Sequence, residues 1–472
     1  MPKEYYKPKE YCGLFGIYGH KDASKLTYLG LYALQHRGEE SCGIVSSDAN
    51  QLYSQKGMGL VNDVFNEVSL NVLKGQLAIG HVRYSTTGSS LVKNAQPLFV
   101  DYLKGSLAIA HNGNLINSTQ LRQDLERNGS IFQTTTDSEI ILQLMVRSQE
   151  VGLKEKLIYA LKSIKGAYSL VMMTEDTLIG ARDPLGFRPL WLGKVDGSFC
   201  LASETCALDL IEAKAIREIE PGEIVFINKN GLKSFKPFPK PKNCAFCIFE
   251  HIYFSRPDSV IFGENVHLVR QNLGRNLAKE FPVEADFVIP VPDSGFSAAL
   301  GFSHESGMPL EMGIIRNHYV GRTFIQPTQH IRDLGVKIKF NIMKDVIKGK
   351  KIVIVDDSIV RGTTSRKRVR TFRQAGAKEV HMRISCPPHR FPCFYGIDFH
   401  TQKELIAFKY SLKEIQEFLD VDSLGYLSLE GLYKSVSLPK KDYCVACFTG
   451  SYPLKFVSKV DKYAFEKKCC GF

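Results

Sequence analysis

The sequence predicts an α+β part in its first half followed by an α/β part with a parallel sheet. Before about residue 240, short apolar runs separated by turn residues are typical of a layered, strand-rich unit. After it, apolar strands alternate with helices, which is the pattern of a parallel sheet. Between the two, KSFKPFPKPKN (233–243) is rich in proline and lysine and predicts a connector.

In the first half, turn residues bound each apolar run, as expected of strands in a half-buried sheet. Two further segments carry apolar residues at helical spacing and are expected to cover the sheets. The predicted helices are 24–36 and 137–148, and the predicted strands are 77–84, 107–113, 167–174, 177–183 and 223–228.

In the second half, the strands are continuous apolar runs, as expected when a parallel sheet is buried on both faces. Helices are predicted at 266–280 and 363–375, the second ended by Gly376. The predicted strands are 286–291, 351–357 and 379–385.

Composition limits the classes of function. The 472 residues are 44% hydrophobic and 23% charged, enough for about two to three globular domains. No apolar run approaches the roughly 20 residues of a membrane helix, and the first eleven residues lack a signal-peptide pattern. The charge of +12 occurs without a basic run interleaved with aromatics. We therefore expect a cytoplasmic protein that binds small anions, with no membrane or nucleic-acid partner.

Cys12 follows a short polar leader and opens the run CGLFGI. A cysteine made N-terminal by cleavage gains an α-amine with a pKa of about 7.7 to 8.0, which can serve as base for its own thiol. Alone, a cysteine beside glycine at a strand start is more often a small buried residue.

Four further motifs, in this order along the chain, favour a catalytic role for Cys12. They are HRGEESCG (36–43), HVRYSTTG (81–88), HNGNL (111–115) and TTDSE (135–139). Together they supply what hydrolysis of free glutamine requires. Any one of these residues could be an ordinary turn former, but the set in this order predicts a glutaminase site.

Each glutaminase role has a candidate residue. Arg83 offers a fork for the α-carboxylate of glutamine, and Asp137 offers an acid for its α-ammonium. Attack on the carboxamide creates an oxyanion, which the Asn112 side chain and the Gly113 amide are expected to hold.

The run KKIVIVDDSIVRGTTS (350–365) predicts a second site, because open α/β sheets bind ligands at the carboxyl ends of their strands. Asp356 and Asp357 suit the two hydroxyls of a ribose and help to hold Mg²⁺. The following loop and helix start offer amides and hydroxyls for a 5′-phosphate, from Arg361, Gly362, Thr363 and Thr364.

Two further segments complete that prediction. PVPDSG (290–295) ends another strand, and we expect it to hold a diphosphate with Ser294 near the metal. YVGRTFIQP (319–327) contains Gly321 and Arg322 and suits a lid over the diphosphate, although an ordinary surface loop is equally compatible.

With these motifs the chain resembles amidophosphoribosyltransferases (glutamine phosphoribosylpyrophosphate amidotransferases) over about residues 12–455. The resemblance implies an N-terminal-nucleophile (Ntn) hydrolase αββα sandwich followed by a type I phosphoribosyltransferase domain. It implies synthesis of 5-phosphoribosylamine from glutamine and phosphoribosyl diphosphate, the first committed step of purine nucleotide synthesis. It also implies autocatalytic propeptide removal before Cys12, a homotetramer, and inhibition by purine nucleotides. The implied domain boundaries are a propeptide at 1–11, a glutaminase domain at 12–240, a phosphoribosyltransferase domain with the iron-sulfur cysteines at 241–455 and a C-terminal tail at 456–472.

Twelve cysteines without an export signal suggest metal or catalysis before disulfides. The pairs CAFC (244–247) and CVAC (444–447) alone predict a zinc site. The resemblance instead implies the iron-sulfur branch of the family. Its [4Fe-4S] ligands would be Cys247, Cys393, Cys444 and Cys447, while Cys244 is an additional thiol that could compete or permit zinc.

Three other functions are compatible with parts of the sequence, and each leaves a motif unexplained. An amidotransferase feeding a sugar-phosphate isomerase would have no place for VIVDDSIVRGTT. A phosphoribosyl-diphosphate-sensing regulator of phosphoribosyltransferase fold would have no use for Cys12 or HNGNL. A catalytically dead homologue would not need to keep Cys12, Asp356 and Asp357 intact.

Overall fold

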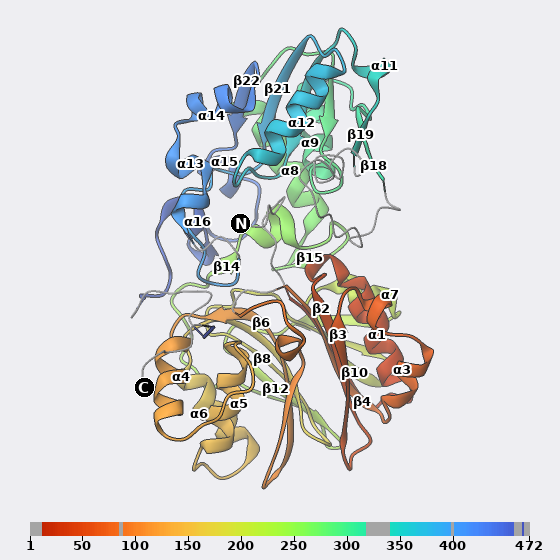
Figure 1. The fold of residues 1–472 in the computed structure, drawn as a ribbon, viewed down its shortest axis with the longest axis vertical. Helices are drawn as coiled ribbons and strands as arrows, with labels where there is room; N and C mark the ends of the chain where they lie inside the picture. Colours follow the sequence, from red (N-terminus) through yellow and green to blue (C-terminus); the bar gives the residue numbers. More distant parts are fainter. Residues whose placement is uncertain (1–11, 85–87, 318–339, 398–400, 457–464, 467–472) are drawn as a thin grey trace.

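The computed structural model describes residues 12–84, 88–317, 340–397, 401–456 and 465–466. The chain folds into two parts, with the earlier residues in the lower body of Figure 1 and the later residues in the upper body. Two antiparallel sheets form the lower part, and a parallel sheet forms the centre of the upper part.

The first sheet of the lower part has seven strands in the order β11-β9-β10-β1-β4-β2-β3, and all its pairings are antiparallel. Its central strand β1 starts one residue after Cys12. The strands are β1 (Gly13–Tyr18), β2 (Ser41–Ser47), β3 (Leu52–Met58), β4 (Leu77–Arg83), β9 (Trp191–Val195), β10 (Ser198–Ala202) and β11 (Lys214–Glu218).

The second sheet has six antiparallel strands in the order β13-β12-β8-β7-β6-β5. The strands are β5 (Leu98–Tyr102), β6 (Gly105–Leu115), β7 (Gly166–Met173), β8 (Leu178–Arg182), β12 (Ile224–Asn228) and β13 (Gly231–Phe235). The predicted strands of the first half are therefore present, each within a few residues of its expected limits.

The layering follows from the alternation of side chains along each strand. In β1, Leu14 joins a cluster with Ala108 and Val171 of the second sheet, so this face lies between the sheets. Its neighbours Phe15 and Ile17 belong to a different cluster, on the outer face with the helices. The two sheets therefore pack face to face and each has an outer face to be covered.

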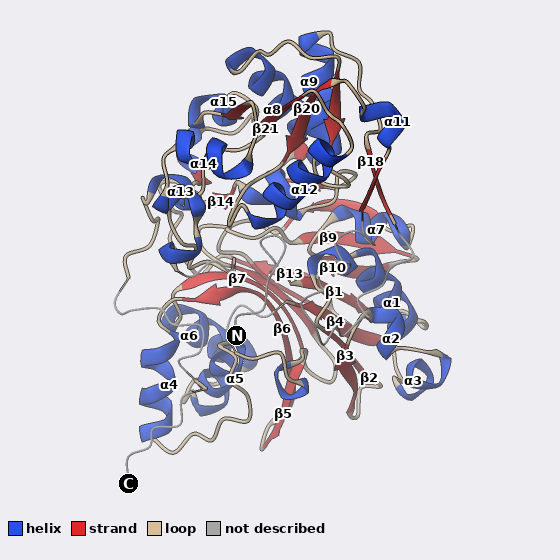
Figure 2. Ribbon diagram, turned by 45° about the horizontal axis from the view of Figure 1, so that its top comes forward, coloured by secondary structure: helices blue, strands red, loops and turns tan. Residues whose placement is uncertain are grey.

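Helices cover both outer faces (Figure 2). On the first sheet lie α1 (Ala23–Ala33), α2 (Val61–Val64), α3 (Glu67–Val72) and α7 (Thr205–Leu210). On the second lie α4 (Ser118–Arg127), α5 (Ser138–Arg147) and α6 (Leu153–Ser163). This arrangement confirms the predicted αββα sandwich.

The upper part contains a four-stranded parallel sheet in the order β17-β20-β21-β22. Its strands are β17 (Phe287–Pro290), β20 (Lys351–Asp356), β21 (Glu379–Ile384) and β22 (Ser423–Tyr426). The helices around them include α8 (Val266–Glu280), α9 (Phe296–Ser306), α12 (Thr363–Gln374) and α14 (Leu412–Leu419). Both predicted helices and all three predicted strands of this half are confirmed.

Smaller elements complete the upper part. A short parallel pair, β14 (Phe246–Cys247) and β23 (Tyr443–Cys444), joins its first and last segments. The other short elements in the described ranges are η3 (Glu250–Phe254), β15 (Val260–Ile261), β16 (Glu264–Asn265), β18 (Ile314–Arg316), β19 (Phe340–Ile342), α11 (Lys344–Ile347), η4 (Gln402–Glu404), α13 (Ile406–Lys409), α15 (Leu429–Tyr433), η5 (Lys440–Asp442) and α16 (Ala446–Thr449).

The two parts share apolar contacts. The core of the upper part also takes in Ile116, Ala167 and Phe187 from the lower part. The Phe187 ring stacks on Tyr395 with ring centroids 4.4 Å apart. None of the helices in the described ranges is long and apolar enough to cross a membrane.

Candidate active site

Cys12 lies buried at the point where the chain enters the first sheet. Its thiol is 3.7 Å from the carbonyl oxygen of Tyr84, which directly follows β4. Its own carbonyl accepts a hydrogen bond of 3.0 Å from Nε of Arg37. Arg37, in the next motif along the sequence, therefore holds the main chain of the candidate nucleophile in place.

Burial raises the pKa of the Cys12 thiol to about 11, and the contact with Tyr84 and the charges of Arg83 and Arg37 lower it only in part. The thiol is therefore neutral near pH 7. A nucleophile in this state needs an adjacent base to take its proton. The α-amine that cleavage before residue 12 would free has a suitable pKa, about 7.7 to 8.0.

Asn112 and Gly113 lie together on β6. The Asn112 side chain is buried, and its Nδ2 has no hydrogen-bond partner among the described residues. A buried amide without a partner costs about 1 to 3 kcal/mol, so it is expected to serve a ligand. Gly113 has φ +150°, and a Cβ there would lie 2.0 Å from the carbonyl oxygen of Ala167. Only glycine fits this position.

Arg83 and Asp137, the candidates for the two ends of glutamine, are both buried near Cys12. Both charges act on its thiol, Arg83 lowering its pKa and Asp137 raising it. Nη1 of Arg83 donates to the carbonyl of Ser89 at 3.3 Å. Oδ2 of Asp137 accepts from the Leu115 amide at 2.8 Å. Arg83 and Asp137 thus lie within electrostatic range of the Cys12 thiol, and Asp137 also binds β6, the strand that carries Asn112 and Gly113.

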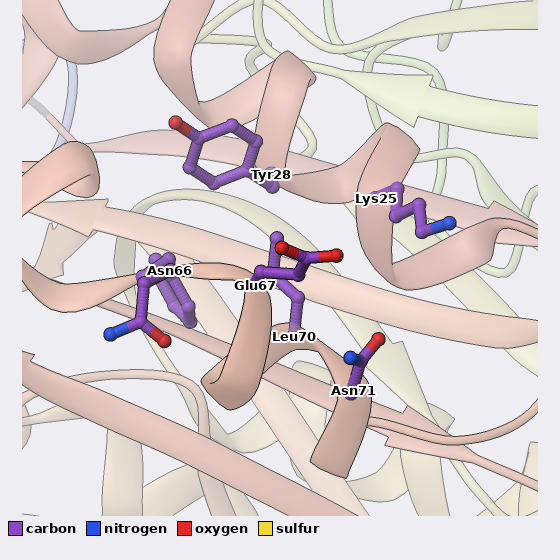
Figure 3. Close-up of a pocket in the computed structure, with 7 residues that line it drawn as sticks. Lys25, Tyr28, Asn66, Glu67, Leu70 and Asn71 are labelled. Atoms are coloured by element: carbon purple, nitrogen blue, oxygen red, sulfur yellow. The ribbon is translucent and has the colours of Figure 1, made fainter.

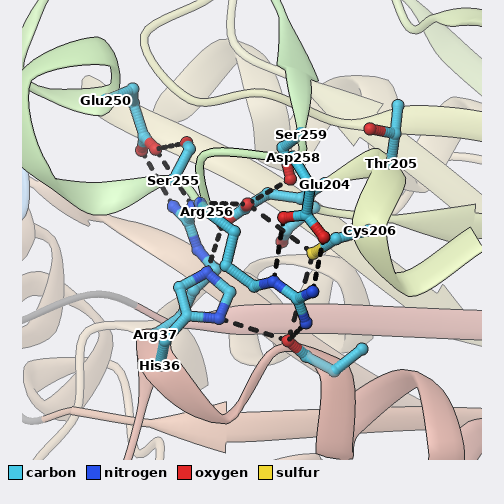
Figure 4. Close-up of polar contacts among 12 residues, drawn as sticks. His36, Arg37, Glu204, Thr205, Cys206, Glu250, Ser255, Arg256, Asp258 and Ser259 are labelled. Atoms are coloured by element: carbon cyan, nitrogen blue, oxygen red, sulfur yellow. Dashed lines mark hydrogen bonds and ion pairs between the residues drawn. The ribbon is translucent and has the colours of Figure 1, made fainter. Parts of the chain in front are cut away.

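Two groups of residues at this site were missed from sequence. Arg37, within the HRGEESCG motif but given no role, is fully buried between Glu204 and Glu250 (Figure 4). Glu466, assigned to the tail, accepts from the Ser89 amide and from Oγ1 of Thr135. Residues 204, 250 and 466 are far from the motifs in sequence, so spacing gave no signal for them.

In the upper part, the two predicted loops meet at one edge of the sheet. β17 runs parallel to β20, and the Val291 amide donates to the carbonyl of Val355 at 2.9 Å. This places the loop that contains Ser294 at the same edge of the sheet as the acidic pair 356–357. Gly295 packs so closely that a Cβ there would lie 2.6 Å from the Val355 oxygen.

Both acids of the pair are buried and hydrogen-bonded. Asp356 accepts from Nη1 of Arg368 at 2.8 Å and from the Asp357 amide at 3.0 Å. Asp357 accepts from the Ser358 hydroxyl at 2.6 Å. Arg368, one turn into α12, was not foreseen from sequence and supplies the positive charge that a buried carboxylate requires.

The proposed phosphate loop leads directly into α12. Gly362 has φ +75°, a left-handed conformation suited to glycine, and it caps the helix that starts at Thr363. Thr363 and Thr364 thus lie in the first turn, where backbone amides favour anions. Nη2 of Arg361 pairs instead with Glu404 at 2.8 Å. Arg322 and the predicted lid lie outside the described residues.

The four cysteines assigned to a cluster converge although they come from three distant segments. Cys247 and Cys444 are register partners in the β14–β23 pair. Burial raises the pKa of the Cys447 thiol far above its usual value. The charges of the nearby thiols of Cys393, Cys444 and Cys247 raise this pKa further. Cys244 is only partly buried, whereas these four cysteines are buried, and its amide donates to Oδ1 of Asp442 at 2.9 Å. Cys386, which was given no role from the sequence, also raises the pKa of the Cys447 thiol.

In the described part of the chain, no group of three or more His, Cys, Asp or Glu side chains is arranged to hold a single metal ion. A surface cavity of about 260 Å³ lies elsewhere, between α1 and α3 (Figure 3). It is lined by Lys25, Tyr28, Phe65, Asn66, Glu67, Leu70 and Asn71. None of the predicted site residues lines it.

Known proteins resemble both parts of the chain. Residues 81–210 match the glutamine amidotransferase domain family. The amidophosphoribosyltransferase of Bacillus subtilis is 51% identical over 449 residues, covering 94% of each chain. The chain belongs to the amidophosphoribosyltransferase family.

Other members agree in extent and fold. Amidophosphoribosyltransferase 1, chloroplastic, of Arabidopsis thaliana is 53% identical over 453 residues, covering 95% of this chain and 80% of its own. The solved structure of the B. subtilis glutamine phosphoribosylpyrophosphate amidotransferase, complexed with ADP and GMP, superposes with a TM-score of 0.91. It is 49% identical and covers 97% of this chain and all of its own.

Family membership establishes the activity and the fold class. The protein is an enzyme with amidophosphoribosyltransferase activity, which carries out the first step of purine biosynthesis. The parallel sheet belongs to the phosphoribosyltransferase domain, and the sandwich is a class II glutamine amidotransferase domain of the Ntn type. The regulator and isomerase alternatives are thereby excluded.

Proposed function

We propose that Cys12 attacks the carboxamide of glutamine and that the ammonia released displaces pyrophosphate from phosphoribosyl diphosphate at Asp356 and Asp357. The observation that carries this proposal is that Nδ2 of Asn112 has no hydrogen-bond partner among the described residues, although it is buried on β6, the strand whose Leu115 amide binds Asp137. An oxyanion formed there would give this donor the partner that it lacks.

In the glutaminase step, the α-amine of a processed Cys12 takes the thiol proton as sulfur bonds to the carboxamide carbon. The proton passes to the leaving nitrogen, which departs as ammonia and leaves a thioester. Water then releases glutamate. Arg83 and Asp137 hold the α-carboxylate and α-ammonium, while Asn112 and Gly113 hold the oxyanion.

Replacing Asn112 with Ala is expected to lower the glutamine-dependent kcat by about 10² to 10³, because one oxyanion donor is removed. Ammonia-dependent synthesis should be unchanged, since it bypasses this step. Asn228→Ala, at the half-buried end of β12 in the same sheet, is the matched control. Equal loss in both nitrogen assays would show that Asn112 is not an oxyanion donor.

In the transfer step, the ammonia nitrogen bonds to C1 of the ribose as pyrophosphate leaves with the bonding electrons. Asp356 and Asp357 would hold the ribose hydroxyls, and the start of α12, from Arg361 to Thr364, would hold the 5′-phosphate. The carboxylates and the Ser294 hydroxyl are oxygen donors of the kind that Mg²⁺ prefers. When bound, Mg²⁺ would neutralise the diphosphate charge. Arg322 is proposed to cover this site.

The four converging thiols suit a [4Fe-4S] cluster in donor chemistry, and we assign Cys247, Cys393, Cys444 and Cys447 to it. Such a cluster would tie together three segments of the upper part. Zinc remains the alternative, and the burial of the four assigned thiols, compared with the partial exposure of Cys244, favours the four-cysteine set without it.

Elemental analysis of anaerobically purified protein tests this assignment. We expect about four iron and four sulfide per chain, lost in Cys447→Ser and retained in the matched variant Cys244→Ser. One zinc and no iron per chain would overturn it.

The remaining properties are proposed from relatives. The B. subtilis relative was solved with ADP and GMP, so purine nucleotides are the expected inhibitors here. A homotetramer, a cytoplasmic location and removal of residues 1–11 stay predictions, as do the limits 12–240 and 241–455. Relatives named chloroplastic make a plastid the alternative location.

A further inference from the structure

Four buried charged side chains lie between the two parts of the molecule. Arg37, Arg188, Glu204 and Glu250 each have 1% or less of their surface exposed. Glu250 comes from η3 in the upper part, and the other three come from the lower part. Their formal charges cancel, as is required of ionised groups without solvent.

Glu250 holds both arginines. Its Oε1 accepts from Nη2 of Arg37 at 2.8 Å and from Nη1 of Arg188 at 2.9 Å. Its Oε2 accepts from Nη1 of Arg37 at 3.0 Å and from the Ser255 hydroxyl at 2.9 Å. Burial would raise the pKa of Glu250, but Arg37 and Arg188 hold it below its usual value.

The two arginines bind different main-chain segments. Arg37 donates from Nε to the carbonyl of Cys12 at 3.0 Å. Arg188 donates from Nη2 to the carbonyl of Tyr395 at 3.1 Å. Beside Tyr395, the carbonyl of Phe394 accepts from the Asn114 side chain at 3.0 Å, and Asn114 directly follows Gly113 on β6.

We propose that Glu250 is a positioning residue for glutamine hydrolysis: through Arg37 it orients the Cys12 main chain, and through Arg188 it supports the strand that carries the oxyanion donors. The proposal rests on the proposed role of Cys12. A residue of the upper part thereby controls the geometry of a reaction that occurs in the lower part.

The geometry of the Arg37 fork explains why a carboxylate is needed at residue 250. Three of its nitrogens are committed, with Nε on Cys12, Nη2 on Glu250, and Nη1 on both Glu204 and Glu250. A planar guanidinium held at two edges cannot rotate, so its Nε direction is fixed. A neutral amide at residue 250 would pair with only part of this set and leave the fork free to turn.

The test compares glutamine and ammonia as nitrogen sources for Glu250→Gln in the full-length, processed enzyme. We expect the glutamine-dependent kcat to fall by about 10²-fold, the cost of a reacting group displaced by about 1 Å. KM for phosphoribosyl diphosphate and the ammonia-dependent rate should stay within about twofold. The ammonia assay on the same sample reports whether the variant is folded.

The matched control is Glu223→Gln. Glu223 is also buried and also binds an arginine fork and a serine hydroxyl, those of Arg217 and Ser234. It contacts neither Arg37 nor Arg188 in any hydrogen bond described above. We expect both nitrogen activities to persist in this variant, so a loss specific to glutamine cannot come from removing any buried carboxylate.

A double variant separates positioning from a general structural role. Because Glu250 acts in part through Arg37, Glu250→Gln combined with Arg37→Gln should lose less glutamine activity than the product of the two single losses. Additive losses, or parallel losses with both nitrogen sources, would overturn the proposal. So would a Glu250→Gln enzyme that uses glutamine normally. If Cys12→Ala also used glutamine normally, the assignment of Cys12 would fail instead.

Discussion

Cys12→Ala is expected to reduce glutamine-dependent synthesis below about 10⁻⁴ of the original rate, because the residue that forms the thioester is gone. Ammonia-dependent synthesis by the same enzyme should continue, since the phosphoribosyl site in the upper part is unaltered. Pyrophosphate release measured with each nitrogen source gives both values from one preparation.

Cys42→Ala is the matched control for this variant. Cys42 is equally buried, on β2 of the same sheet, and has no proposed role in the reaction. Both activities should persist in it. Mass spectrometry of the active enzyme provides the decisive companion result: residues 1–11 still attached to fully active protein would contradict the role of the terminal amine.

Asp357→Ala is expected to show the opposite pattern. Removing a carboxylate that we propose holds the ribose and Mg²⁺ should lower phosphoribosyl transfer from either nitrogen source by about 10³-fold, since such metal contacts contribute several kcal/mol. Hydrolysis of glutamine to glutamate should survive at a low, uncoupled rate. Glutamate and pyrophosphate assayed in parallel distinguish the two steps.

Asp345→Ala, at an exposed carboxylate in the first turn of α11, controls for loss of an acid from the same part of the chain. It should behave as the unaltered enzyme does. Full ammonia-dependent synthesis by Asp357→Ala would remove the acidic pair from the site.

The fold was largely predictable because its strands are marked by local patterns. The alternation that sends Leu14 to the inter-sheet core and Phe15 to the helices is present in the sequence itself. The acidic pair at 356–357 could be placed for the same reason, since it ends a continuous apolar strand and precedes a glycine-capped helix.

What escaped prediction depends on contacts between distant segments. No motif in the sequence marks Glu204, Glu250 or Arg37 as partners. Only the packing of the two parts brings the two carboxylates to Arg37. Arg368 likewise becomes a partner of Asp356 only because α12 packs on its strand. The convergence of Cys247 with Cys444 could be suspected from spacing, but the partial burial of Cys244 and its bond to Asp442 depend on the fold.

The coupling of a glutaminase to a phosphoribosyl transfer in one chain is tested most directly by the products that purified enzyme forms from glutamine and phosphoribosyl diphosphate supplied together. We expect glutamate and pyrophosphate to form in equal amounts, and pyrophosphate release to cease when the nitrogen source is omitted. Glutamate formation without any pyrophosphate, with ammonia also unable to support pyrophosphate release, would contradict this coupling.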